Sequence, residues 1–455
     1  MKHTVWRWLA ISSVVTAAIL TRAETRPQYG GTLRVAMRAA PVSLDPADSA
    51  QADSFAQRSM TLLMFETLVR TDDNGHVQAC LADTWQEASS RRRWQFHLRK
   101  GVKLHDGSAL TPEVAAASLR SANPAWRVSA EPDAVVIEST DAELLRELAL
   151  SRNAIAVRNT DNKPIGSGPF QIVDWQPGKK LTLAANESYW GGRPFLEGIE
   201  IEMGRSYHDQ LMELQLGRAD LVEVAPEQMH RSALDSRAAE SSAPVELMAL
   251  AFTHDAQTPE EKSLRQALAL SVDRISIRNV LLQGAGQPAG GLLPNWMSGY
   301  EFVFPSEANL AAARQAREQA HAVPSWNLAC DSNDPLARLV AERIILNARD
   351  AGLSMRLASG SSPDVRLMRI GLPSADPWVA LSAVAAATGL TIANERGDSI
   401  SDLYAAEEAI LQTQRVVPLF HLPVSYASAP RLRDWMLRAD GTWNVADAWL
   451  GNGVQ

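Results

Sequence analysis

The chain has 455 residues, of which 46% are hydrophobic and 21% are charged, a composition that is ordinary for a globular protein. It excludes a fibre, a collagen and a globally disordered chain, and the length predicts two or three domains. The formal charge of −8 argues against a nucleic-acid partner, because binding to a phosphate backbone requires clustered Lys and Arg.

The N-terminus has the pattern of a secretory signal peptide, predicted over residues 1–23. Lys2 and Arg7 precede a short apolar run, and small residues stand three positions and one position before the expected cleavage point after Ala23. The run is too short to span a bilayer, which takes about 20 apolar residues. Cleavage would lower the net charge from −8 by three units to −11.

We therefore expect a soluble mature protein outside the cytoplasm. No cysteine lies near the cleavage point, so a lipid anchor is not expected. The alternative is that the leader stays attached as an amphipathic anchor.

The first part of the chain predicts a strand, a helix and a small α/β unit. Residues 30–39 alternate between apolar and polar after turn glycines, as a strand does, and an amphipathic helix is predicted to start at Ser54. Residues 94–98 alternate in the same way, and 102–104 suggest a second short strand. Thr111, followed by Pro112, is a typical N-cap and first residue of a helix.

The segment 166–192, GSGPFQIVDWQPGKKLTLAANESYWGG, combines turn signals with a strand-like alternation and carries no nucleophile–base pair. Its first glycines and proline predict a tight backbone bend. Two alternating strands follow, joined by a turn at Pro177 and Gly178. The segment therefore suits the rigid frame of a protein that holds a molecule without transforming it.

Strands and helices alternate in the remainder, which predicts α/β layers. The expected elements are a helix over 207–216, a strand over 220–224, a helix pair over 258–284, a helix over 335–351 and a strand over 416–427.

No enzyme motif is found. The sequence has no Gly-x-Ser-x-Gly, His-Glu-x-x-His or phosphate-binding loop, and the nine histidines show no metal-ligand spacing. We therefore expect no catalysis, no cofactor and no metal site. Cys80 and Cys330 could form one disulfide or remain two buried free thiols, and we favour the thiols.

Thirteen tryptophans are many for this length, and most are expected to pack in the core. Trp126 and Trp378 lie in loop-like sequence contexts and are candidates to line a binding cleft, where a flat apolar wall with one polar group suits a small ligand.

Successive blocks of the chain resemble the family 5 solute-binding proteins, which are the oligopeptide-, dipeptide- and nickel-binding receptors of ABC importers. The blocks follow the family order from about Gly30 to Pro294. They are GGTLRVA, FETLVRTDDNGHVQACLADTW, WQFHLRKGVKLHDGSALTPEVAAASL, IGSGPFQIVDWQPGKKLTLAANESYWGG, LQLGRADLVEVAP and LRQALALSVDRISIRNVLLQGAGQPAGGLLP.

The resemblance implies an α/β fold of the two-lobed periplasmic-binding-protein type (class II, mixed sheets), with two hinge strands and an extra small α+β domain inserted in the first lobe. The expected division is 24–50 with 160–246 and 430–455 for the first lobe, 51–159 for the inserted domain and 247–429 for the second lobe.

The resemblance also nominates ligand-binding residues. Asp376, in the segment SADPWVAL, matches an acid that pairs with the ammonium group of peptide ligands, with Trp378 beside it. The alternative is that Asp376 only caps the helix that follows. On the ligand interpretation, Asp376→Ala would leave the melting temperature of the empty protein nearly unchanged. Met60 and Trp126 resemble metal-complex contacts of nickel-binding members.

The function that the resemblance implies is capture of a small solute, most simply a short peptide, by lobe closure and delivery to a membrane permease. The receptor is expected to be a monomer with no nucleic-acid partner. The alternatives are an exported sensor or chaperone-like binding protein without an import role, a nickel-chelate receptor, and an exported hydrolase.

Overall fold

The structure is a computed structural model, and it describes most of the chain. The described residues are 26–48, 54–73, 75–88, 92–139, 143–158, 163–229, 238–300, 304–321, 324–332, 334–358, 362–392, 397 and 399–451. The predicted signal peptide lies outside them. Within these ranges, no helix combines the length and the apolar character that crossing a bilayer demands.

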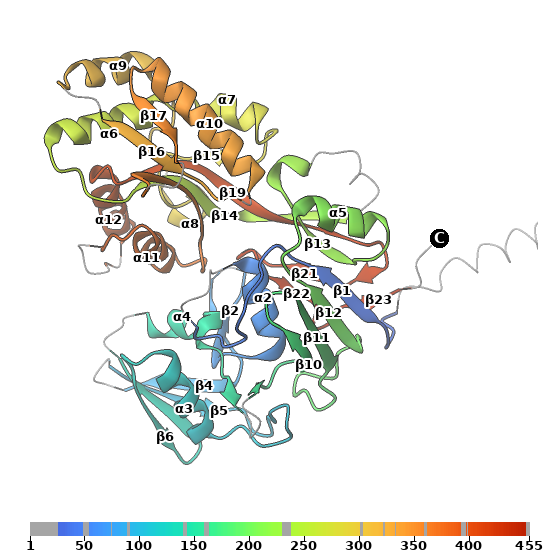
Figure 1. The fold of residues 1–455 in the computed structure, drawn as a ribbon. Coiled ribbons are helices and arrows are strands. Elements are labelled where there is room, and N and C mark those ends of the chain that lie inside the picture. The colour runs from blue at the N-terminus through green and yellow to red at the C-terminus, as the bar shows by residue number, and fades with distance from the viewer. Residues whose placement is uncertain are drawn as a thin grey trace, which may run out of the picture.

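One large mixed sheet runs through the molecule (Figure 1). Its strands, in spatial order, are β10 (Phe170–Gln176), β11 (Lys180–Ala185), β12 (Gly198–Glu202), β1 (Thr32–Ala36), β13 (Leu221–Val224), β19 (Val416–Ser428), β14 (Ala238–Phe252), β18 (Val365–Gly371), β16 (Ser325–Ala329) and β17 (Ser354–Leu357), and β15 (Gln287–Pro288) pairs with β19.

The antiparallel pair β14 and β19 crosses from one half of the molecule to the other. β14 has 15 residues and β19 has 13, and one end of β19 pairs with β13 while the other lies beside the part of β14 that pairs with β18. The register shifts around Pro244, which lies opposite Pro423. Because proline has no N–H to donate, the hydrogen-bond ladder is interrupted at this crossing point.

The first lobe is built on β1 and β10–β13. α2 (Phe55–Met64) and α5 (Tyr207–Gln215) pack against it, together with the C-terminal strands β20 (Leu432–Arg433), β21 (Met436–Leu437), β22 (Trp443–Asn444) and β23 (Trp449–Leu450). The C-terminal segment is fastened to α2, because the backbone N–H of Trp443 donates to Ser59 Oγ at 2.9 Å. Residues from the early part of the chain and from its C-terminal segment thus pack together in the core of the first lobe.

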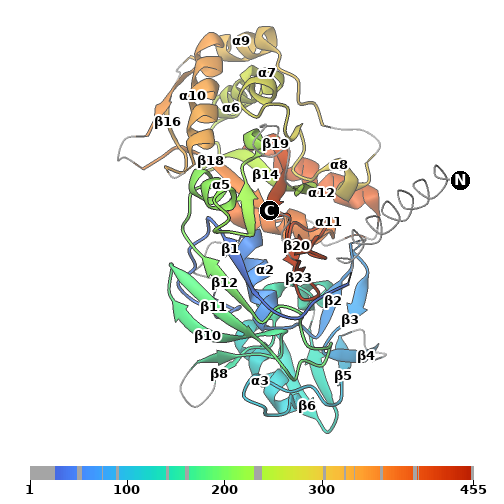
Figure 2. The same ribbon diagram turned by 90° about the vertical axis from the view of Figure 1, so that its right-hand side faces the viewer.

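The small domain has its own core (Figure 2, lower part). A four-stranded antiparallel sheet in the order β4 (Ala82–Glu87), β5 (Arg93–Leu98), β7 (Ala134–Glu138) and β6 (Arg127–Glu131) is joined by α3 (Pro112–Ala122) and α4 (Leu144–Leu148). The short elements nearby are β2 (Val69–Thr71), β3 (Val77–Ala79), η1 (Ser151–Asn153), β8 (Val157–Arg158) and β9 (Pro164–Ile165).

The predicted start of α3 is confirmed, since Thr111 Oγ1 accepts from the backbone of Val114 and Pro112 is the first helical residue. The predicted strand over 102–104 is wrong. Residues 102–104 form only one isolated bridge, between Lys103 and Ala109, because the chain turns at residues 105–107 before a strand can form.

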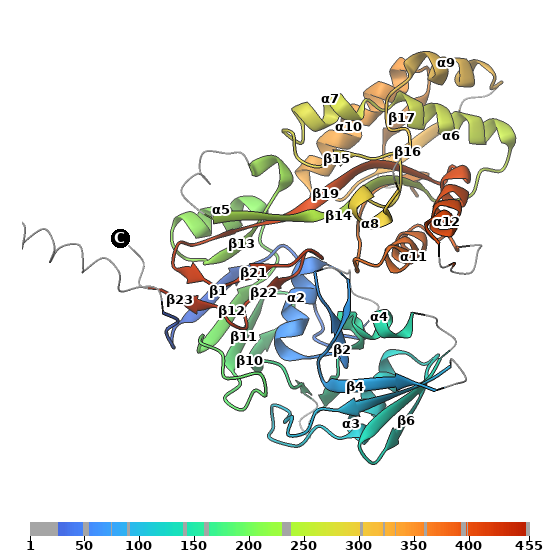
Figure 3. The same ribbon diagram turned by 180° about the vertical axis from the view of Figure 1, so that it is seen from behind.

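The second lobe covers its part of the sheet on both faces (Figures 1 and 3). One face carries α6 (Pro259–Ser271), α7 (Arg274–Val280), α9 (Leu310–Glu318) and α10 (Pro335–Asp350), and the other carries α8 (Asn295–Ser298), α11 (Pro377–Ala387) and α12 (Ile400–Gln412). Residues of β14 alternate between these cores, with Met248 and Leu250 on one side and Leu247 and Ala249 on the other. η2 (Pro226–Gln228) follows β13.

A buried carboxylate explains the ordered segment 166–192. Glu66, just after α2, accepts hydrogen bonds from Ser167 Oγ at 2.7 Å, Tyr189 Oη at 3.0 Å and Trp190 Nε1 at 2.9 Å. Burial raises the pKa of Glu66, and these donors partly oppose that shift. The segment thus supplies the polar partners that a buried carboxyl group requires.

The glycines at the start of that segment allow the close approach. A Cβ on Gly168 would lie 2.6 Å from the carbonyl oxygen of Leu63, at the end of α2. Only glycine leaves room for the two backbones at this distance.

Both cysteines are free, as we expected. Cys80 is buried, and burial raises the pKa of its thiol to about 12. Cys330 is only half-buried, contrary to expectation, because it lies at the end of β16 where the chain leaves the sheet.

A second buried carboxyl group lies inside the second lobe. Glu407, on α12, accepts from the backbone N–H groups of Leu292 and Leu293 and is fully buried. Burial raises its pKa from 4.5 to about 7. His421 Nε2 donates to the carbonyl oxygen of Leu292 at 3.2 Å, and burial lowers the pKa of His421 to about 4.

Glu407 should make stability depend on pH. Because its folded pKa of about 7 exceeds the ordinary 4.5, its favourable contribution is complete below pH 4.5, falls as the pH rises and is lost above pH 7. Relative to Glu407→Gln, the wild type should lose up to about 3 kcal/mol of unfolding free energy between pH 4.5 and pH 8. Urea unfolding across this range measures the difference. Glu408→Gln, on the same helix, is the control, and parallel wild-type and Glu407→Gln profiles would contradict the assignment.

Candidate functional site

Three neighbouring cavities lie where the lobes and the small domain meet. The central one, of about 320 Å³, is lined by residues 46–48 after β1, by α2, by residues 149–152 around η1, by Pro373 after β18 and by Asp440 and Thr442 of the C-terminal segment. It therefore touches both lobes and the small domain.

The other two cavities share walls with the central one. A cavity of about 440 Å³ between α3 and the loop after β1 shares Ala47 and Ala122 with it. A cavity of about 610 Å³ between α4 and α11 shares Arg152 and Pro373 with it. The central cavity thus adjoins each of the other two.

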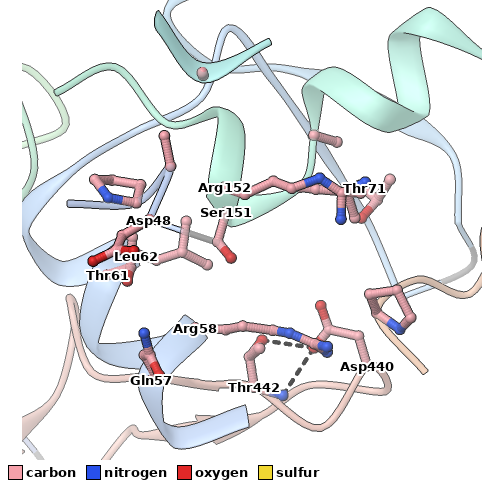
Figure 4. Close-up of a pocket in the computed structure, with 16 residues that line it drawn as sticks. Asp48, Gln57, Arg58, Thr61, Leu62, Thr71, Ser151, Arg152, Asp440 and Thr442 are labelled. Atoms are coloured by element: carbon pink, nitrogen blue, oxygen red, sulfur yellow. Dashed lines mark hydrogen bonds between the residues drawn. The ribbon is translucent and has the colours of Figure 1, made fainter. Parts of the chain in front are cut away.

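Two arginines line the central cavity, and Figure 4 shows their side chains running along opposite walls. Arg58 lies on α2, is 7% exposed and stacks its guanidinium over the Phe55 ring at 4.9 Å. Arg152 follows the small domain's α4, and its guanidinium binds both carboxylate oxygens of Glu147 at 3.0 and 2.6 Å. A guanidinium is the side-chain group best suited to bidentate binding of a carboxylate.

The C-terminal segment supplies polar groups to the same wall. Asp440 Oδ1 accepts from the backbone N–H of Thr442 at 2.9 Å and from Thr442 Oγ1 at 2.6 Å, the two bonds drawn in Figure 4. The cavity thus presents cationic, anionic and hydroxyl groups together, a lining that can fix the orientation of a small polar solute.

Asp376 is the N-cap of α11. Its Oδ1 accepts from the backbone N–H groups of Trp378 and Val379, both at 3.0 Å, and its own N–H donates to Ser374 Oγ at 3.1 Å. Its Oδ2 lies 3.2 Å from Nη1 of Arg146, on α4. The structure therefore shows that Asp376 caps α11 and pairs with Arg146, and ligand contact by Asp376 stays a prediction.

Arg146 has a second carboxylate partner, because it also donates to Glu143. Burial lowers the pKa of the Arg146 guanidinium, but the carboxylates of Glu143 and Asp376 outweigh this effect and the pKa lies above its usual value.

The other nominated residues are mostly in cores. Met60 is 1% exposed in the core of the first lobe, and Trp126 is 5% exposed in that of the small domain. Neither lines the three cavities. Trp378 is 8% exposed and forms part of the wall of the cavity between α4 and α11. Of the four nominated residues, only Trp378 lines one of these cavities.

The sequence analysis missed Arg58, Arg152 and Asp440. Arg58 stands among apolar residues of an amphipathic helix. A charged residue at such a position is rarely buried without a role, and this signal could have identified Arg58 as a candidate. Nothing in the sequence indicated that Asp440 returns to α2 from the far end of the chain.

Two lobes and an added small domain around adjoining cavities, the central one with polar groups on its walls, define a solute-binding protein of the periplasmic type. The sequence pattern of the bacterial extracellular solute-binding proteins, family 5 (middle region), matches residues 76–370. The chain belongs to this family, and the resemblance seen in the sequence is confirmed.

Curated relatives are similar over part of the chain. Oligopeptide-binding protein AppA of Bacillus subtilis is 27% identical over 305 residues, which cover 58% of this chain and 54% of AppA. Nickel-binding protein NikA of Staphylococcus aureus is 26% identical over 246 residues, or 49% of each chain. The chain thus spans about half the length of these relatives.

Solved structures show the same fold. NikA of Staphylococcus aureus in complex with Ni(L-His)2 has a TM-score of 0.78 at 16% identity, covering 90% of this chain and 97% of that one. AppA of Bacillus subtilis in complex with a nonapeptide has a TM-score of 0.77 at 18% identity, covering 94% and 100%. The predicted two-lobed α/β fold with an added small domain is confirmed.

The structure changes one expectation about Asp376. Asp376→Ala removes the cap of α11 and one carboxylate partner of Arg146, so we now expect a loss of about 1–3 kcal/mol of unfolding free energy in the empty protein. Asp376→Asn keeps an acceptor for the two amides and should lose less. Urea unfolding compares them, with Ser206→Ala, an exposed N-cap on α5, as control. Equal stability of the Ala and Asn variants would contradict the capping role.

Proposed function

We propose that this protein is the solute-binding component of an ABC importer, which captures a short peptide or a similar solute by lobe closure and passes it to a membrane permease without a catalytic step. The observation that carries the proposal is the central cavity, whose walls come from both lobes and the small domain. A solute held there gains its full set of contacts only in the closed form.

Closure then follows from differential affinity. A ligand shifts an equilibrium between open and closed forms only if it binds the closed form more tightly. Arg58 and Arg152 both lie outside the second lobe and would hold a carboxylate there, so the preference for the closed form has to come from the groups that the second lobe adds, such as Pro373 in the central cavity. Trp378 would add an apolar wall in the neighbouring cavity.

Two of the similar proteins support a peptide as the ligand. AppA is described as oligopeptide-binding, and a structure similar to this chain is a dipeptide-binding protein of Pseudoalteromonas in complex with Met-Leu. The similarity to NikA keeps a nickel chelate as the second candidate. Among the described residues, no group of three or more His, Cys, Asp or Glu could hold a metal ion directly.

The domain limits and the nominated contacts are part of this proposal. We place the first lobe at 24–50, 160–246 and 430–455, the inserted domain at 51–159 and the second lobe at 247–429, with the exception that α2, inside 51–159, packs in the core of the first lobe. Ligand contact by Met60 and Trp126 stays a prediction, and their positions in the cores weigh against it.

Peptide binding should depend on the cavity arginines. We expect trialanine to bind Arg152→Gln about tenfold more weakly than the wild type, because a charge-assisted hydrogen bond is lost. Trialanine amide, which lacks the carboxylate, should bind both proteins alike. Calorimetry measures the affinities. Arg58→Gln repeats the test on the opposite wall of the central cavity. Arg93→Gln, away from the cavities, is the control.

Native mass spectrometry of the protein isolated from its host should find an intact bound solute. Recovery of cleaved peptide would support the hydrolase alternative. A nickel chelate in the cleft would support the second candidate, and no stabilisation by any peptide would contradict the peptide proposal.

We also propose that the leader is removed and that the mature protein is a periplasmic monomer without a lipid anchor. The intact mass of the protein from a periplasmic fraction should correspond to a chain beginning at Glu24. A mass that retains Met1 would support the anchored alternative, and added lipid mass would contradict the proposal.

A further inference from the structure

One ion pair joins two parts of the molecule that are distant in sequence. Arg146 lies on α4 of the small domain, and Asp376 begins α11 of the second lobe, with 3.2 Å between Nη1 and Oδ2. Figure 3 shows α11 facing α4 across this boundary. The pair therefore bridges the small domain and the second lobe.

Both oxygens of the Asp376 carboxylate are engaged within the chain. Oδ1 accepts from two backbone amides at the start of α11, and Oδ2 faces the guanidinium. The side chain is only 4% exposed. A carboxylate that is buried to this extent requires a counter-ion, and Arg146 provides it.

The carboxylates around this point all have arginine partners. Glu143 shares Arg146 with Asp376, and Glu147 is bound by Arg152. Glu143, Glu147 and Trp378 line the cavity between α4 and α11. Asp376 itself does not line this cavity, and a ligand ammonium group could pair with it only by displacing the guanidinium of Arg146.

We propose that Arg146 acts as the chain's own cation for Asp376, so that the ion pair holds the small domain against the second lobe in the empty protein and a ligand needs no free amino group. Arg146 is thus a specificity-determining residue. The part that concerns ligands rests on the proposed function, whereas the contact between the two domains does not.

X-ray scattering of the empty protein tests the contact. Arg146→Gln and Asp376→Asn each remove one charge, and the Asn variant keeps the acceptor for the helix cap. Both should give a larger radius of gyration than the wild type. The control is Arg93→Gln, because Arg93 has two carboxylate partners, Glu131 and Glu138, within the small domain's own sheet. Scattering curves that superimpose for all four proteins would overturn the proposal.

A matched pair of probes tests the specificity. Trialanine and N-acetyl-trialanine differ in the ammonium group, and the wild type should bind both with affinities within about threefold, a difference of under 1 kcal/mol. In Arg146→Gln, Asp376 becomes available to the ligand, and trialanine should gain about tenfold over the acetylated probe. This ratio would not change if Arg146 only stabilised the fold.

The outcomes separate the two proposals. A wild-type preference for trialanine above tenfold that disappears in Asp376→Asn would show that Asp376 binds the ligand ammonium, which overturns the inference and leaves the solute-binding function in place. If neither probe binds any variant, the peptide function fails, and the scattering measurement still decides whether Arg146 holds the domains together.

Discussion

The pairing of β14 with β19 is the constraint on which the rest of the structure depends. These strands carry the large sheet from one lobe into the other, and they meet β13 on one side and β18 on the other. The proline pair at 244 and 423 interrupts the ladder between these regions. The lobes therefore stay connected by continuous strands, while the two prolines remove backbone N–H donors from the ladder between them, and the backbone N–H of Val424 donates to Ser242 Oγ instead.

Ion pairs add to this connection at two places, beside the crossing strands and between α4 and α11. Near the crossing strands, Arg369 binds Glu246 and lies 3.2 Å from Asp334, and Arg38 of the first lobe lies 3.7 Å from the same Asp334. Between α4 and α11, Arg146 and Asp376 bridge the small domain and the second lobe. Charges paired across a boundary depend on the relative position of the two parts, whereas the apolar cores lie within each part.

Local signals predicted most of the elements and the family. Thr111 and Pro112 marked the start of α3, and alternation marked β5, because N-cap chemistry and strand periodicity act over a few residues. The candidate site was predicted less well. Met60 has the residue type of a ligand contact but faces a core, and Asp376 serves a helix end and Arg146, since burial and distant partners decide what a side chain can reach.

The sequence by itself determined the family, the order of strands and helices, and the presence of an ordered frame over residues 166–192. Only the tertiary structure decided that this frame serves the buried carboxylate of Glu66, and that Arg58 on α2, Arg152 near α4 and Asp440 near the C-terminus meet around one cavity. The physical reason is the separation along the sequence over which each kind of interaction acts. Turn and capping preferences are local, whereas a binding site is made by side chains that chain folding brings together from hundreds of residues apart.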